Sequence, residues 1–248
     1  MDIILYNIIA CLASLIFGYF FGSIPVGVIL CRLFKGQDPR DFGSKNSGGT
    51  NVGRIFGMKL GAATILLDAL KTILPMILVW ILLKFCGLSK IMVKNFNQDF
   101  YNNGSLIILF APLGATLGHC WPIFADFRGG KAVSNYTGFT FLTCWLSFVL
   151  GFLAFGGTLK KSKYVSLSSI IGSSVATLVS WAMYIFATLT SFDMNLFFIG
   201  FGIWTLWSSA CLEYAIIMTL MSFILIFRHR NNIKKLIAGC ENKIKWMK

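Results

Sequence analysis

The sequence predicts an all-α integral membrane protein, a single domain over residues 1–248 with seven transmembrane helices, the fourth and fifth short. Three observations predict this class. Hydrophobic residues make up 56% of the 248 residues and charged residues 12%, whereas soluble domains carry about 25% charged residues. Long apolar runs recur along the chain. The basic residues that give the net charge of +13 gather between those runs. We therefore expect a multi-pass protein of a cell membrane.

Six apolar stretches predict membrane helices, since a bilayer core of ~30 Å takes ~20 apolar residues per helix. They cover residues 3–31, 60–83, 104–118, 132–159, 164–190 and 195–227. No cleavage site of the A-x-A type ends the first stretch, so we expect a true span and not a signal peptide. No linker separates the stretches, which predicts one compact bundle.

The positions of Lys and Arg indicate which loops face the cytoplasm. Of the 22 basic residues, 18 lie in four segments: 32–59, 119–131, 160–163 and 228–248. We place these segments and the C-terminus in the cytoplasm. The N-terminus, segment 84–103 and the turn at 191–195 are then outside. The positive charge therefore reports topology, and we expect no nucleic-acid partner.

Residues 132–159 must cross an even number of times, because both flanking segments are placed inside. Their 28 residues would form a helix of ~42 Å at about 1.5 Å per residue. That length is too long for one crossing and short for two, so we predict two short helices. A re-entrant hairpin bending at Gly151, Gly156 or Gly157 is an alternative. A six-helix arrangement with 160–163 outside is another.

The richest polar segment is Asp41-Phe-Gly-Ser-Lys-Asn-Ser-Gly-Gly-Thr-Asn-Val-Gly-Arg54. Glycines let backbone N–H groups converge, hydroxyls and amides add donors, and Arg54 supplies a bidentate fork, a combination that suits a phosphate. The candidate ligands are Ser44, Asn46, Gly48, Thr50, Asn51 and Arg54. An ordinary polar turn that caps the next helix is the alternative. The spacing of Gly49, Gly53, Gly57 and Gly61 predicts a close helix-packing stripe.

A second candidate segment, 118–131, ends in Arg128-Gly129-Gly130-Lys131 directly before an apolar helix. Amides at a helix N-terminus bind anions, and the two flanking cations strengthen such a site. The segment is not a Walker A loop, because Ala125 and Ala132 occupy positions that the loop requires to be Gly and Ser or Thr. A basic anchor that only sets topology is the alternative. His119 is expected at the membrane interface beside Trp121.

Two further polar segments follow. Segment 160–169 combines three lysines with hydroxyls that include Ser166, and anchoring plus helix capping explains most of it. The tail from Arg228 suits an amphipathic segment on anionic lipid, but basic charge alone does not require His229, Asn232 or Glu241. Inside the second span, Asp68 and Lys71 stand at i,i+3, where pairing lowers the cost of two buried charges. A structural ion pair and a functional one are both open for them.

The seven cysteines include no CxxC pair, so we expect no disulfide and no metal site.

Taken in order, these segments resemble the bacterial membrane-integral glycerol-3-phosphate acyltransferases that use acyl phosphate. The resemblance covers nearly the whole chain. It rests on Gly22-Ser-Ile-Pro25, Gly43 to Arg54, Leu67-Asp-Ala-Leu-Lys71, Gly118 to Lys131, Lys163-Tyr-Val-Ser-Leu167 and Arg228-His-Arg-Asn-Asn-Ile233. Single motifs of this kind are weak, whereas six in the same order are specific.

The resemblance implies a transfer of a fatty acyl group from acyl phosphate to the 1-hydroxyl of sn-glycerol 3-phosphate, without a cofactor or a metal. It implies catalytic roles for Ser44, Arg54, Lys131, His229 and Asn232. Binding of substrate phosphate is implied for Arg128, Gly129, Gly130 and Ser166, and a structural role for Glu241. The family's seven helices gather the motifs at the cytoplasmic face.

Four positions depart from the family pattern. Lys45 stands where the family usually has Gly, Gly49 where it has Ala, Arg128 where it has Lys, and Ala132 where it has Gly. Two other functions compete with the family reading. A transporter or channel for a phosphorylated metabolite would place its site near the bilayer midplane, unlike these motifs. A soluble-type acyltransferase needs His and Asp five apart, whereas His119 and Asp126 are seven apart.

Overall fold

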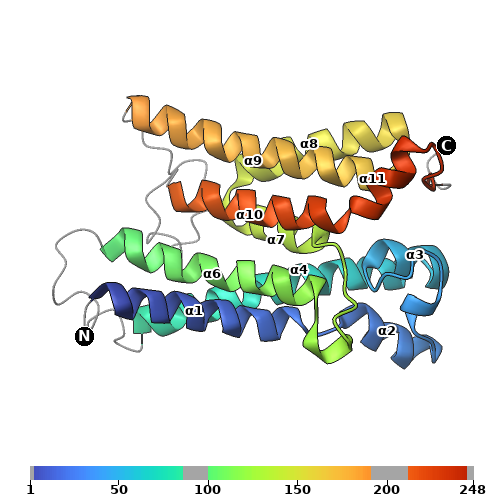
Figure 1. Ribbon diagram of the computed structural model, residues 1–248, viewed down its shortest axis with the longest axis horizontal. Coiled ribbons are helices and arrows are strands. Elements are labelled where there is room, and N and C mark those ends of the chain that lie inside the picture. Colours follow the sequence, from blue (N-terminus) through green and yellow to red (C-terminus); the bar gives the residue numbers. More distant parts are fainter. Residues whose placement is uncertain (1–2, 86–99, 191–211, 245–248) are drawn as a thin grey trace. The chain divides into compact units, whose positions relative to one another are not determined.

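The computed structural model describes residues 3–85, 100–190 and 212–244, which form α-helices joined by turns and two short 3₁₀ helices (Figure 1). The chain forms two compact units, Met1–Phe139 and Thr140–Lys248. Unit 1 holds the two glycine-rich segments, 41–54 and 118–131. Unit 2 holds the lysine-rich segment 160–169 and the basic tail from Arg228. The expectation of a single domain stays a prediction.

In unit 1 the first apolar stretch is two helices, α1 (Ile3–Gly22) and α2 (Val26–Lys35). The span predicted over 3–31 is confirmed as a candidate membrane span, Leu5–Lys35, but its helix is broken near the cytoplasmic end assigned to it. The helix is interrupted at Ser23–Pro25, where Pro25 has no N–H to continue the helical hydrogen bonds and adopts φ −84° and ψ 70°. The motif Gly22-Ser-Ile-Pro25 thus marks a turn.

The other helices of unit 1 are α3 (Gly49–Phe56), α4 (Met58–Phe85), α6 (Phe100–Cys120) and the first part of α7 (Val133–Thr143). α1 lies along α6 (Figure 1). Four glycines make this close approach possible, because a Cβ at any of them would overlap backbone atoms of the facing helix. They are Gly18 and Gly22 on α1, and Gly114 and Gly118 on α6.

The predicted glycine stripe is confirmed at three of its four positions. A Cβ on Gly49 would lie 2.6 Å from the Gly61 carbonyl oxygen, and one on Gly61 would lie 2.5 Å from the Gly53 Cα. These contacts bring α3 against α4. Gly57 instead ends α3 with φ 103°, a conformation that only glycine adopts readily.

Unit 2 contains α8 (Trp145–Ser162), α9 (Val165–Thr190), α10 (Leu212–Arg228) and α11 (Arg230–Ile237). α8 and α10 both lie against α9 (Figure 1). Gly151 of α8 faces Gly172 and Ala176 of α9 without a side chain between them, and Trp181 Nε1 donates to Thr219 Oγ1 at 2.9 Å. α11 turns away from α10 by 57°.

Two helices, α7 and α8, divide the stretch 132–159, as predicted, but neither is among the candidate membrane spans of the described residues. The helices meet at Cys144, which has the extended angles φ −144° and ψ 101°. The three glycines named as bending points are all inside α8. Two short helices are consistent with an even number of membrane crossings by this stretch, which stays a prediction.

Within the described residues, four helices are long and apolar enough to span a membrane, or five if α10 and α11 form one bent span. They expose apolar side chains such as Ile16, Leu66 and Phe223, whereas Asp68, Lys71 and His119 are buried. This inversion is the pattern of a protein surrounded by lipid. The turn at 191–195, most of loop 84–103 and the start of the stretch 195–227 lie outside the described residues.

Candidate active site

The first glycine-rich loop of unit 1 is organised around the buried side chain of Asn51. Its amide nitrogen donates to the carbonyl oxygens of Pro39, Asn46 and Phe42 at 2.9, 2.9 and 3.2 Å. Its amide oxygen accepts from Ser44 N at 2.9 Å. Asn51, predicted as a phosphate ligand, thus holds the loop together from within.

The other predicted ligands of this segment are placed around that centre. Ser44, Thr50 and Arg54 are exposed, and Thr50 and Arg54 stand one helical turn apart on α3. Asn46 is half-buried, and its side-chain oxygen accepts from Gly48 N at 2.7 Å. Hydroxyl and guanidinium donors are therefore exposed on this loop and on the first turns of α3, and the side-chain amides of Asn46 and Asn51 hold the loop in shape.

A buried arginine, Arg40, which was not predicted from the sequence as a site residue, connects this loop to the second glycine-rich loop. Arg40 pairs with Asp38 through its Nε and Nη2 at 2.8–3.2 Å, and its Nη1 donates to the Ala125 carbonyl oxygen at 2.8 Å. Donation from Arg40 lowers the pKa of Asp38 to about 2, and Asp38 in turn raises the pKa of Arg40. The sequence signal was the turn Asp38-Pro39-Arg40, in which an Asp caps a 3₁₀ helix begun by Pro.

The second glycine-rich loop folds back on the end of α6. Gly130 N donates to the His119 carbonyl oxygen at 2.9 Å. Gly129 and Gly130 are buried, Lys131 is half-buried and Arg128 is exposed. Asn46 Nδ2 lies 3.5 Å from the Gly129 carbonyl oxygen, at the long limit of a hydrogen bond. The loop leads directly into α7, as predicted for a helix N-terminus.

His119 is buried beneath this loop, in the last turn of α6; its expected place at the membrane interface beside Trp121 stays a prediction. Its Nδ1 lies 3.4 Å from Asp68 Oδ1, and the same oxygen lies 3.0 Å from Lys71 Nζ. Lys71 Nζ also donates to the Ile24 carbonyl oxygen at 2.8 Å, at the break between α1 and α2. The predicted pairing of Asp68 with Lys71 is thus present, and it includes a third partner.

Two of the four departures from the family pattern occupy left-handed backbone. Lys45 has φ 54° and Ala132 has φ 63°. This region costs an L-residue roughly 1–2 kcal/mol and glycine almost nothing. Glycine, which the resemblance leads us to expect at both positions, would adopt this backbone without that cost.

Lys45→Gly is expected to raise the free energy of unfolding by about 0.5–1 kcal/mol, because the strain relieved exceeds the added entropy of the unfolded chain. Ala132→Gly should stay within roughly 0.5 kcal/mol, since a buried methyl group worth about 0.8 kcal/mol is lost. Thermal unfolding of the purified protein in detergent measures both. Lys59→Gly, in the first turn of α4, is the matched control and should destabilise by about 1 kcal/mol. If Lys45→Gly and Lys59→Gly changed the free energy of unfolding equally, Lys45 would not be strained by its left-handed backbone.

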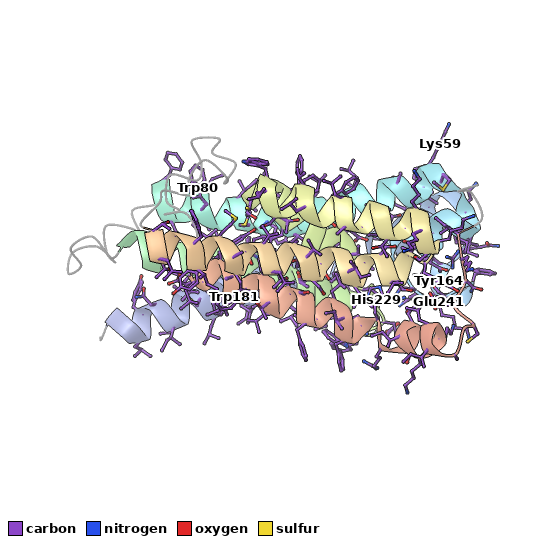
Figure 2. The ribbon with its side chains drawn as sticks, turned by 90° about the horizontal axis from the view of Figure 1, so that it is seen from above. Lys59, Trp80, Tyr164, Trp181, His229 and Glu241 are labelled. Carbon is purple, nitrogen blue, oxygen red and sulfur yellow. The ribbon has the colours of Figure 1, made fainter. Side chains whose placement is uncertain are left out.

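In unit 2 the tail is fastened to the start of α9. Glu241 Oε1 accepts from Asn232 Nδ2 at 2.7 Å and from Ser166 Oγ at 3.1 Å. Ile244 N donates to the Lys163 carbonyl oxygen at 2.9 Å. Tyr164, His229 and Glu241 gather at one end of this unit (Figure 2). Contacts of this kind suit the structural role predicted for Glu241.

His229 is buried at the junction of α10 and α11, where its Nδ1 lies 2.8 Å from the Leu225 carbonyl oxygen. A carbonyl oxygen only accepts, so Nδ1 carries a proton. In the neutral ring, Nε2 is then the basic nitrogen. The ring is therefore held in a defined tautomer.

Comparison with known proteins gives the same family throughout. The sequence profile of the family described as glycerol-3-phosphate acyltransferase matches residues 12–239. A glycerol-3-phosphate acyltransferase of Listeria monocytogenes serotype 4a is 36% identical over 233 residues, covering 92% of this chain and 94% of that protein. One of Ureaplasma parvum serovar 3 is 30% identical over 249 residues, covering 98% and 91%.

Two solved structures share the fold. The crystal structure of PlsY, an integral membrane glycerol 3-phosphate acyltransferase, in its glycerol 3-phosphate form has a TM-score of 0.68 and 28% identity, covering 95% of this chain and 96% of that one. Its lysophosphatidic acid form gives a TM-score of 0.67 and 27% identity, with 95% of each chain covered. A family match over most of the chain, on an all-helical fold with apolar spans, identifies a multi-pass membrane enzyme. The chain therefore belongs to the glycerol-3-phosphate acyltransferase family.

Proposed function

We propose that this membrane acyltransferase transfers a fatty acyl group from acyl phosphate to the 1-hydroxyl of sn-glycerol 3-phosphate. The products are lysophosphatidic acid and inorganic phosphate, and the reaction is the first acylation of phospholipid synthesis. The observation that carries the proposal is the junction of two donor-rich loops in unit 1, where Arg40 bonds the Ala125 carbonyl oxygen. Two anionic substrates require such a concentration of cations and N–H donors.

Within unit 1 we assign Ser44, Arg54 and Lys131 to catalysis, and Asn46, Gly48, Thr50, Arg128, Gly129 and Gly130 to the substrate phosphates. Asn51 supports these groups by shaping the loop, since its amide already makes four hydrogen bonds. Within unit 2, catalytic roles for His229 and Asn232 and a binding role for Ser166 stay predictions. Lys71 and Asp68 are structural.

The chemistry needs little covalent help from the protein. Acyl phosphate is a mixed anhydride, so its carbonyl carbon is already activated. The acceptor oxygen attacks that carbon, the bond from carbon to the phosphate oxygen breaks, and inorganic phosphate leaves. The hydroxyl proton passes to a substrate phosphate oxygen, with Nε2 of His229 as the alternative base. Positioning and charge stabilisation then supply most of the rate enhancement.

No covalent acyl-enzyme is expected, with Ser44 acting as a hydrogen-bond donor. A serine nucleophile needs an adjacent base that a third group orients, whereas in the described part of unit 1 the loop around Ser44 is hydrogen-bonded to the side-chain amides of Asn46 and Asn51. Purified protein incubated with labelled acyl phosphate alone should remain unlabelled after denaturation. Stoichiometric label that Ser44→Ala abolishes, and that chases into product, would overturn direct transfer.

The same proposal includes the topology, with seven spans, the motifs and the C-terminus in the cytoplasm and the N-terminus outside. Single cysteines at positions 45, 128, 162 and 240 on a Cys-free background should resist impermeant reagents added to intact cells. A cysteine at position 95, which lies outside the described residues, should react. Labelling of position 162 from outside would favour six helices.

The identity of the acyl donor is the most direct test of the proposed reaction. Purified protein should form lysophosphatidic acid from acyl phosphate and glycerol 3-phosphate, and should form none when acyl-CoA replaces acyl phosphate. Activity should survive chelation of metal ions by EDTA. If lysophosphatidic acid formed with acyl-CoA and not with acyl phosphate, the acyl donor would be acyl-CoA and the proposed reaction would be wrong. Uptake of glycerol 3-phosphate into vesicles without acylation would instead favour the transporter.

A further inference from the structure

We propose that Asp68 and His119 are positioning residues that hold the loop of Gly129 and Gly130 in the conformation that binds the phosphate of glycerol 3-phosphate. The inference rests on the proposed function, and it assigns Asp68 a part beyond its ion pair with Lys71. All the groups involved belong to unit 1.

The two glycines of the loop lie directly on His119. A Cβ at Gly130 would overlap the imidazole at Nε2, and a Cβ at Gly129 would overlap the His119 carbonyl oxygen. Neither glycine has a positive φ, so conformational freedom does not explain them. Their missing side chains are required by the histidine beneath them, and the hydrogen bond from Gly130 N to His119 O fastens the two segments.

His119 is itself held from the opposite side of its ring. Its Nδ1 lies 3.4 Å from Oδ1 of the Asp68 carboxylate, a contact that favours a proton on Nδ1 because a carboxylate only accepts. Asp68 is fixed in turn by Lys71 Nζ at 3.0 Å, which is bonded to the Ile24 carbonyl oxygen. A chain of buried contacts therefore runs from the turn between α1 and α2, through α4 and the end of α6, to the backbone of the loop.

A competing account is that Asp68 only neutralises Lys71. Two double variants separate the accounts, because both remove the ion pair without leaving a lone buried charge. Asp68→Leu/Lys71→Met removes the acceptor for His119, whereas Asp68→Asn/Lys71→Met keeps an amide oxygen there. Both lose the bond from Lys71 to Ile24, so this loss cancels in the comparison.

The leucine variant is expected to raise KM for glycerol 3-phosphate by roughly five- to tenfold, the effect of one hydrogen bond. KM for acyl phosphate should change by less than about twofold, as for an interaction with one substrate only. The asparagine variant should recover most of the wild-type KM for glycerol 3-phosphate. His119→Phe should reproduce the leucine variant and add little to it, because both break the same contact.

The rise in melting temperature on adding glycerol 3-phosphate gives a second readout that needs no turnover. It should shrink in the leucine variant and return in the asparagine variant. Equal and wild-type KM values in both double variants would overturn the proposal, since charge balance alone then explains Asp68. If the leucine variant does not fold, His119→Phe against His119→Asn, whose amide keeps a donor towards Asp68, decides by the same two readouts. A wild-type enzyme that neither acylates nor is stabilised by glycerol 3-phosphate would refute the proposed function instead.

Discussion

Arg54→Ala and Lys131→Ala are each expected to lower activity at least tenfold while leaving the protein folded. Arg54 lies on α3, directly after the first glycine-rich loop, and Lys131 ends the second one, and we assign both to the substrates. A hydrogen bond from a charged donor is worth ~1.5–3 kcal/mol, which corresponds to about 10–150-fold in affinity or rate. Arg54 is exposed on α3, so its removal should cost little stability. Initial rates with both substrates, together with a thermal melt of each variant, measure the two effects separately.

The controls for this experiment are other basic residues. Lys59, labelled in Figure 2, is exposed at the start of α4, five residues from Arg54. The predicted topology puts both residues on the cytoplasmic side. Lys90 and Lys94 are predicted on the opposite side. Alanine at each of these three positions should change activity by less than about twofold. If Lys59→Ala lost as much activity as Arg54→Ala, the basic residues would serve topology or general electrostatics only.

Arg40→Ala is expected to destabilise the protein by about 3 kcal/mol, since it leaves the Asp38 carboxylate poorly solvated and without its main partner. It also removes the donor to the Ala125 carbonyl oxygen, so the second loop loses a tie to the first. Activity should therefore fall even in the folded fraction. Thermal unfolding in detergent and rates measured well below the melting temperature give the two quantities.

Arg32→Ala is a close control, because Arg32 bonds the same carboxylate. Arg32 Nη2 and Arg40 Nη2 lie 2.9 and 2.8 Å from Asp38 Oδ2, but the Arg32 side chain is 62% exposed and that of Arg40 is 8% exposed. An exposed ion pair contributes at most ~1 kcal/mol. Arg32→Ala should thus be mild, and Arg40→Lys intermediate, since lysine keeps the charge but not the bidentate geometry. A similar loss of stability for Arg32→Ala and Arg40→Ala would contradict the role of burial.

The fold class and the order of the motifs could be predicted from the sequence, because hydropathy and the positions of basic residues act over long stretches. The division of 132–159 followed from length and charge parity. The position of the break could not be predicted, because Cys144 has no strong backbone preference. Of the three glycines named as bending points, Gly151 serves helix packing, and Gly156 and Gly157 lie inside α8 with no neighbouring atom near a Cβ position. Pro25 could have predicted the break in the first helix, but it lies within a long apolar stretch that indicates a single membrane helix.

The site was predicted through residue types and not through their partners. Exposed donors such as Ser44 and Arg54 stand out in a polar segment. The groups that shape the loops do not, because their roles depend on contacts far apart in sequence. Arg40 reaches the carbonyl oxygen of Ala125, and His119 reaches Asp68 on another helix. Asn51 is a residue type that often binds ligands, but its side chain is hydrogen-bonded to the backbone of its own loop.

The most direct test of the account follows both halves of the donor in one reaction. Acyl phosphate labelled with ¹⁴C in the acyl chain and ³²P in the phosphate is mixed with purified protein and unlabelled glycerol 3-phosphate. We predict ¹⁴C in lysophosphatidic acid and ³²P in inorganic phosphate in equal molar amounts, with neither released when glycerol 3-phosphate is omitted. Label from ³²P in the lipid, or phosphate released without lysophosphatidic acid, would contradict acyl transfer from acyl phosphate to glycerol 3-phosphate.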